Sequence, residues 1–139
     1  MAFAGINYLA VVIAAVVAWL AGAGWYMTLS KTWMAAQGIT PEQMAEAKKR
    51  PGAHLPFLYT LVAELIMAWM LAGIIGHLGA LTLRGGIITA AFCWFGFVIT
   101  TLVVNYTFGM RRWLLIVIDG GHWLLVLLLM GAIIGTMGI

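Results

Sequence analysis

Four polar side chains interrupt long apolar stretches of the sequence: Glu64, Asn105, Asp119 and His122. Carboxylates and imidazoles exchange protons and bind cations, and an amide can hydrogen-bond to either group. Asp119 and His122 are three residues apart, so they share one face of a helix. Within a bilayer an ionisable side chain costs about 2.5–3.5 kcal/mol on insertion scales, and it therefore indicates function. These residue types favour the handling of protons or cations inside a membrane.

The four residues are expected at a similar depth. With a rise of about 1.5 Å per residue, Glu64 and Asp119, seven residues beyond Phe57 and Arg112, lie about 10 Å from the cytoplasmic edge. Asn105, six residues before Arg111, lies about 9 Å from the same edge. His122 is one helical turn deeper than Asp119. We therefore predict one buried cluster, formed by three helices and opening toward the cytoplasm.

Three further residues are predicted to support this cluster. Thr101 is four residues before Asn105, so the two form a polar stripe on one helix. Trp69 and Trp123 lie inside apolar runs, where an indole N–H needs an acceptor away from water. Such tryptophans either fill the interior of a helix bundle or form an aromatic wall around a ligand.

The polar cluster is open to three interpretations. It can be a proton or ion relay or a solute site, or it can join helices by hydrogen bonds worth about 0.6 kcal/mol each on average. A metal site built from Glu64, Asp119 and His122 is the third interpretation, but no spacing motif for metal ligands supports it. The sequence has no nucleophile elbow, phosphate-binding loop, HExxH or paired CxxC motif, so we expect neither an enzyme nor a cofactor.

The composition places the chain in a lipid bilayer. Of its 139 residues, 65% are hydrophobic and 8% are charged, whereas soluble domains average roughly 45–50% apolar and about 25% charged residues. A soluble fold could not cover so much apolar surface. Six of the seven basic residues fall in two segments between apolar runs, a pattern of membrane topology rather than of nucleic-acid binding.

The sequence predicts an all-α integral membrane protein with a single domain over residues 1–139. Runs of about 20 apolar residues are long enough to span a bilayer as helices, and none shows the alternation of a strand. Thr40-Pro41-Glu42-Gln43 has the pattern of a capping box, which predicts a short helix over 41–50 in which Glu46 and Arg50 can pair. The four spans are predicted at 6–27, 57–77, 85–108 and 113–137, with a cytoplasmic connector over 28–56.

The basic residues predict the orientation of the four-helix bundle. Positive charge concentrates in the two connectors that follow the first and third spans, and cytoplasmic loops carry such an excess. Both termini are therefore expected outside the cytoplasm. The residues that carry this prediction are Lys31, Lys48, Lys49, Arg50, Arg111 and Arg112.

Several short motifs resemble the bacterial family catalogued as domain of unknown function 1761. They are Asn7-Tyr8-Leu9-Ala10-Val11, Gly24-Trp25-Tyr26, Trp33-Met34, Trp94-Phe95-Gly96-Phe97 and Asn105-Tyr106, together with the glycine-rich start of the fourth span. The resemblance covers nearly the whole chain. It implies a small multi-pass protein of the bacterial inner membrane, and it implies no activity.

Two functional hypotheses follow from the sequence. The first is a small transport or channel-like protein in which the carboxylates carry protons or cations and the histidine relays them. The second is a non-catalytic accessory or scaffold subunit of a larger membrane complex. Four short helices enclose little space, so we expect the lipid-embedded chain to form a homo-oligomer or to join such a complex.

Overall fold

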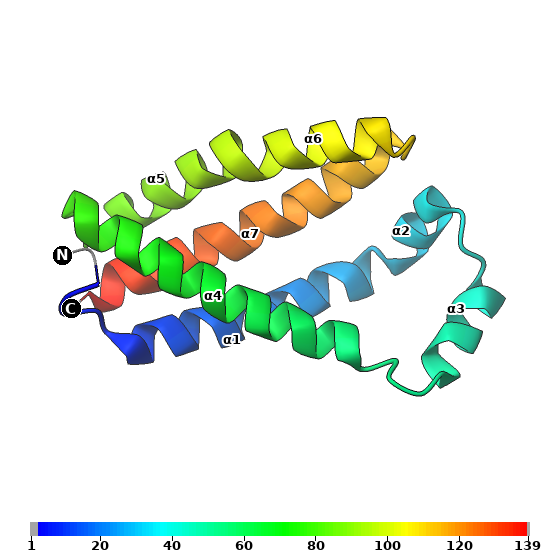
Figure 1. The fold of residues 1–139 in the computed structure, drawn as a ribbon, viewed down its shortest axis with the longest axis horizontal. Coiled ribbons are helices and arrows are strands. Elements are labelled where there is room, and N and C mark those ends of the chain that lie inside the picture. Colours follow the sequence, from blue (N-terminus) through cyan, green and yellow to red (C-terminus); the bar gives the residue numbers. More distant parts are fainter. Residues whose placement is uncertain (1–2, 139) are drawn as a thin grey trace.

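The computed structural model describes residues 3–138, and it contains four helices long and apolar enough to cross a membrane (Figure 1). No strand occurs in this part of the chain. Each long helix satisfies its own backbone hydrogen bonds, as lipid requires. The four are α1 (Tyr8–Thr28), α4 (Leu55–Leu78), the combined helix Leu83–Phe108, and α7 (Trp113–Met137).

The first span begins at a side-chain cap and packs through small residues. The side chain of Asn7 accepts a hydrogen bond from the backbone N–H of Ala10 at 3.2 Å. Ala14 and Ala18 are fully buried on the face that α1 presents to α4 and α7. Small side chains let helices approach closely in a bilayer, where no hydrophobic force drives them together.

Two short helices connect α1 to α4. The first, α2 (Ser30–Gln37), ends at Gly38, whose φ of 75° is the left-handed conformation that glycine adopts readily. The second, α3 (Pro41–Lys49), begins with both hydrogen bonds of the capping box that the sequence predicts.

The ion pair predicted within α3 is not the one that forms. Arg50 has an extended backbone and terminates the helix, so it cannot reach Glu46 along a helical face. Glu46 instead lies 3.5 Å from the ammonium group of Lys49, and both side chains are exposed. An exposed pair of this kind contributes about 0–1 kcal/mol.

The third span is interrupted by a wide turn. It consists of α5 (Leu83–Cys93), the π-helix η1 (Trp94–Val98) and α6 (Ile99–Phe108). A π-helix contains one more residue per hydrogen-bonded turn than an α-helix, and such turns occur often at functional sites. The extra residue rotates every later side chain of the span by about 100° relative to a continuous α-helix.

The fourth span, α7, occupies the centre of the bundle. It packs against α1, α4, α5 and α6, and half of its apolar window is buried, compared with 11% for the third span. At Gly86 and Gly131 the backbones of α5 and α7 are in direct contact. The approach is so close that a Cβ atom on Gly86 would overlap the carbonyl oxygen of Gly131. The central helix is thus the one best placed to hold buried polar groups.

The two ends of the bundle differ (Figure 1). The start of α1 and the end of α7 lie together at one end, while α2 and α3 lie at the other. Arg111, between α6 and α7, donates a hydrogen bond to the side-chain oxygen of Gln37, so both connectors share that second end. Toward this end α4 diverges from α1, whereas α1 and α2 stay beside α7.

Candidate functional site

Asp119 is held between two tyrosines. Its carboxylate on α7 is 6% exposed, and it accepts one hydrogen bond on each oxygen. The hydroxyl of Tyr26 donates to Oδ1 at 2.5 Å, and the hydroxyl of Tyr106 donates to Oδ2 at 2.6 Å. Hydrogen bonds from hydroxyls to an ionised carboxylate are short and strong. One carboxylate therefore joins α1, α6 and α7.

Two indole groups fix the backbone on both sides of this carboxylate. Trp25 on α1 donates from Nε1 to the carbonyl oxygen of Ile118 at 3.0 Å. Trp94, the first residue of η1, donates from Nε1 to the carbonyl oxygen of Gly120 at 2.8 Å. Asp119 thus projects from a stretch of α7 that neighbouring helices hold at adjacent residues.

His122 lies one turn further along α7 and is 4% exposed. Its ring centroid is 4.8 Å from that of Tyr26 and 4.5 Å from that of Trp123. Gly22 provides the room for this ring, because a Cβ atom there would lie 2.6 Å from Nε2. Within residues 3–138, Nδ1 of the histidine has no hydrogen-bond partner.

Glu64 is buried in a different environment. It is 0% exposed, and neither carboxyl oxygen has a hydrogen-bond partner among residues 3–138. On α4 it shares a face with Ala68 and Leu71, both buried and apolar. Counted from the start of each helix, Glu64 and His122 are both about 14 Å deep, near the middle of a hydrocarbon core of about 30 Å.

The predicted cluster residues do not all meet. Asp119 and His122 are brought together through Tyr26, which contacts both. No hydrogen bond or ion pair joins Glu64 to either residue in the described part of the chain. Asn105 lies exposed on the outer face of α6 and does not enter the group around Asp119.

Of the three residues predicted to support the cluster, only one lies beside it. Trp123 is half-buried, and its ring packs against that of His122. Thr101 is exposed, and its hydroxyl donates a hydrogen bond to the carbonyl of Phe97 within the same span. Trp69 is 42% exposed and lies near Phe3, with ring centroids 5.4 Å apart, toward the end of α4 remote from Asp119.

A family model described as protein of unknown function (DUF1761) matches residues 9–135. The chain belongs to this family. The match confirms the resemblance seen in the sequence motifs, and it includes Glu64, Asp119 and His122. No curated protein and no solved structure shows a detectable match to the chain.

Sequence reasoning missed two residues of the site in this DUF1761 protein. Tyr26 and Tyr106 lie at the ends of their spans, where tyrosine commonly marks the membrane–water boundary. A signal was nevertheless present, because Asp119 needs hydrogen-bond donors and tyrosine is the strongest neutral donor in the two neighbouring spans.

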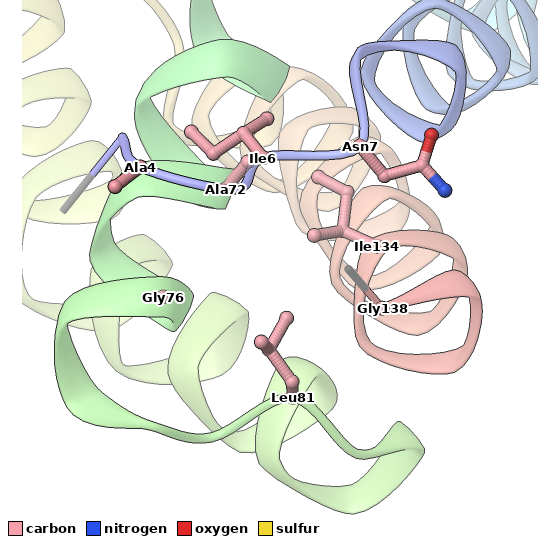
Figure 2. Close-up of a pocket in the computed structure, with 8 residues that line it drawn as sticks. All are labelled: Ala4, Ile6, Asn7, Ala72, Gly76, Leu81, Ile134 and Gly138. Atoms are coloured by element: carbon pink, nitrogen blue, oxygen red, sulfur yellow. The ribbon is translucent and has the colours of Figure 1, made fainter.

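The described residues of the DUF1761 chain form no group of three His, Cys, Asp or Glu side chains that could hold a metal ion. A partly open cavity of about 30 Å³ lies at the opposite end of the bundle, between the residues that precede α1 and the ends of α4 and α7 (Figure 2). That space suits about one water molecule rather than an organic solute. A larger hollow of about 320 Å³ is an open apolar groove on α4, beside Phe3 and His77.

Proposed function

We propose that this DUF1761 protein is a small membrane transport or channel-like protein that handles protons or cations through Glu64, Asp119 and His122. The observation that carries the proposal is the burial of all three side chains. They are 0%, 6% and 4% exposed, inside helices of transmembrane length. Such groups are rare in apolar spans and mark ion or proton pathways.

The polar atoms of this group are only partly satisfied. Asp119 has a donor on each oxygen, whereas Glu64 and Nδ1 of His122 have none within residues 3–138. A group retained only to join helices would be expected to use its hydrogen-bonding atoms, because unpaired buried polar atoms are destabilising. The unpaired atoms therefore favour a role in ion handling over a purely structural one.

The orientation is part of the same proposal. The end of the bundle with α2, α3 and Arg111 carries most of the positive charge, so it faces the cytoplasm of a bacterial inner membrane. Both chain ends then lie outside. Asp119 is six residues into α7, about 9 Å from this cytoplasmic end.

Flux measurements in liposomes test the proposal. The purified protein is reconstituted with an internal pH-sensitive dye, and an imposed pH gradient is followed for the parent chain, Glu64→Gln and Asp119→Asn. We expect both variants to lose flux while circular dichroism shows retained helix. Glu46→Gln is the matched control, because that carboxylate is exposed on α3 and should not affect flux. Parent-level flux in both test variants would exclude the proposal.

A second candidate function is that of an accessory or scaffold subunit. The third span favours it, because it buries only 11% of its apolar window and exposes Thr101 and Asn105 on its outer face. Polar side chains on such a face can hydrogen-bond to a neighbouring helix, from a second copy or another subunit. Gentle extraction followed by native mass spectrometry should then recover specific complexes and no flux by the isolated chain. A homogeneous, partner-free monomer would count against this alternative.

A further inference from the structure

We infer that the ion taken up inside this bundle is a proton, that Glu64 is the residue that binds and releases it, and that metal cations are not bound there. This inference rests on the proposed transport function, and it assigns the substrate of that function. Its basis is the difference between the surroundings of the two buried carboxyl groups.

The Glu64 carboxyl group has no polar neighbour bonded to it. Helices α1, α5 and α7 pack against α4, and none of their titratable or charged groups hydrogen-bonds to Glu64 in the described residues. These groups are Tyr8 and Tyr26 on α1, Arg84 and Cys93 on α5, and Asp119 and His122 on α7. The hydroxyl of Tyr26 is already engaged by Asp119.

A metal cation needs more ligands than this position offers. Calcium takes about 6–8 oxygen ligands and magnesium takes near-octahedral coordination. Glu64 offers two oxygens of one side chain, on a face otherwise formed by apolar residues. A proton needs only one oxygen, so it is the cation that fits.

Asp119 is poorly suited to exchange a proton. Both of its oxygens accept hydrogen bonds from tyrosine hydroxyls, and these bonds connect three helices. Adding a proton to either oxygen would make it a weaker acceptor and so weaken one of these connections. The adjacent carbonyl contacts with Trp25 and Trp94 hold this arrangement in place. Asp119 is therefore committed to the helix contacts, and Glu64 is the group free to take up a proton.

The proposed step is a simple proton transfer. The Glu64 carboxylate accepts one proton from water at one membrane face to form a neutral carboxyl group, and it returns that proton to water at the other face. An ionised carboxylate without a partner is very costly in an apolar interior, so the fully buried state seen here is the protonated one. The unpartnered Nδ1 of His122, at the same depth, is a candidate relay.

Infrared spectroscopy of the protein in liposomes tests the assignment. A neutral carboxyl group absorbs at a frequency distinct from that of a carboxylate. We expect a neutral-carboxyl band at neutral pH that disappears in Glu64→Gln and persists in the control Glu46→Gln. Labelling all glutamates with ¹³C should shift the band in the parent chain, which assigns it to a glutamate even if the variant fails to fold. The other two glutamates, Glu42 and Glu46, are exposed on α3 and should be ionised at neutral pH. Absence of a ¹³C-sensitive band would overturn the inference.

A second test of the inference measures proton flux in a medium without metal ions. Proton flux should persist, unchanged within about twofold, when sodium, potassium and divalent ions are replaced by a large organic cation. A strict requirement for a metal ion, or uptake of one by the parent chain that Glu64→Gln abolishes, would also overturn the inference. A glutamate band without flux in any medium would refute the transport function while leaving the proton site on Glu64 established.

Discussion

Replacing Glu64 with methionine should stabilise the bundle. Methionine has a similar length and no branch, so Glu64→Met preserves the volume of a side chain that is 0% exposed. It removes two oxygens that have no partner in residues 3–138, and a buried polar group without a hydrogen bond costs about 1–3 kcal/mol in protein mutational data. The expected gain in the free energy of unfolding is therefore about 1–3 kcal/mol, at the expense of flux.

Reversible unfolding in bicelles, followed by circular dichroism, measures this gain. The control is Glu46→Met, whose parent side chain is 72% exposed and which should change stability by no more than about 0.5 kcal/mol. If Glu64→Met instead lowers the free energy of unfolding by more than about 1 kcal/mol, the carboxyl group has a partner that stabilises the fold. The reasoning that makes it the exchangeable proton site would then be wrong.

Three other substitutions test the geometry of the bundle, each by unfolding under the same conditions. Tyr26→Phe removes one donor to Asp119 and should lower the free energy of unfolding by about 1.5–3 kcal/mol, the range for hydrogen bonds to charged groups; no loss would exclude that bond. Gly22→Ala places a methyl group 2.6 Å from the ring of His122 and should cost about 1–3 kcal/mol, and the same change should cost much less in a His122→Ala background. Gly86→Ala overlaps a carbonyl of α7, which cannot move as a side chain can, so it should destabilise more than Gly22→Ala; a smaller effect would contradict the close helix contact.

The long helices could be predicted from the sequence because their signal is local. Apolar length alone selects helices in lipid, where each backbone group must be bonded within its own segment. The start of α3 at Pro41 and its capping box were also readable, since both depend on neighbouring residues. The ion pair of Glu46 was predicted wrongly, because the sequence does not show that Arg50 leaves the helix.

The residues that form the site were harder to predict from the sequence, because they depend on how each helix is rotated about its axis. All four spans are apolar on every side, so hydropathy does not tell an inner face from an outer one. In the third span the π-helix also changes the direction of every side chain that follows it. It places Tyr106 toward Asp119 and leaves Asn105 exposed, whereas the prediction for Asn105 had rested on its depth. Nothing in the sequence reasoning anticipated that interruption.

The glycine contact between α5 and α7 has a mechanical consequence. At Gly86 and Gly131 the two backbones are in direct contact. Because no side chain lies between them, no change of rotamer can make room for one helix to slide past the other. At the opposite end, α1, α6 and α7 are linked through two tyrosine hydroxyls on the carboxylate of Asp119. Near the termini α5 and α7 are therefore fixed against sliding, and near α2 the helices α1, α6 and α7 are held together by hydrogen bonds.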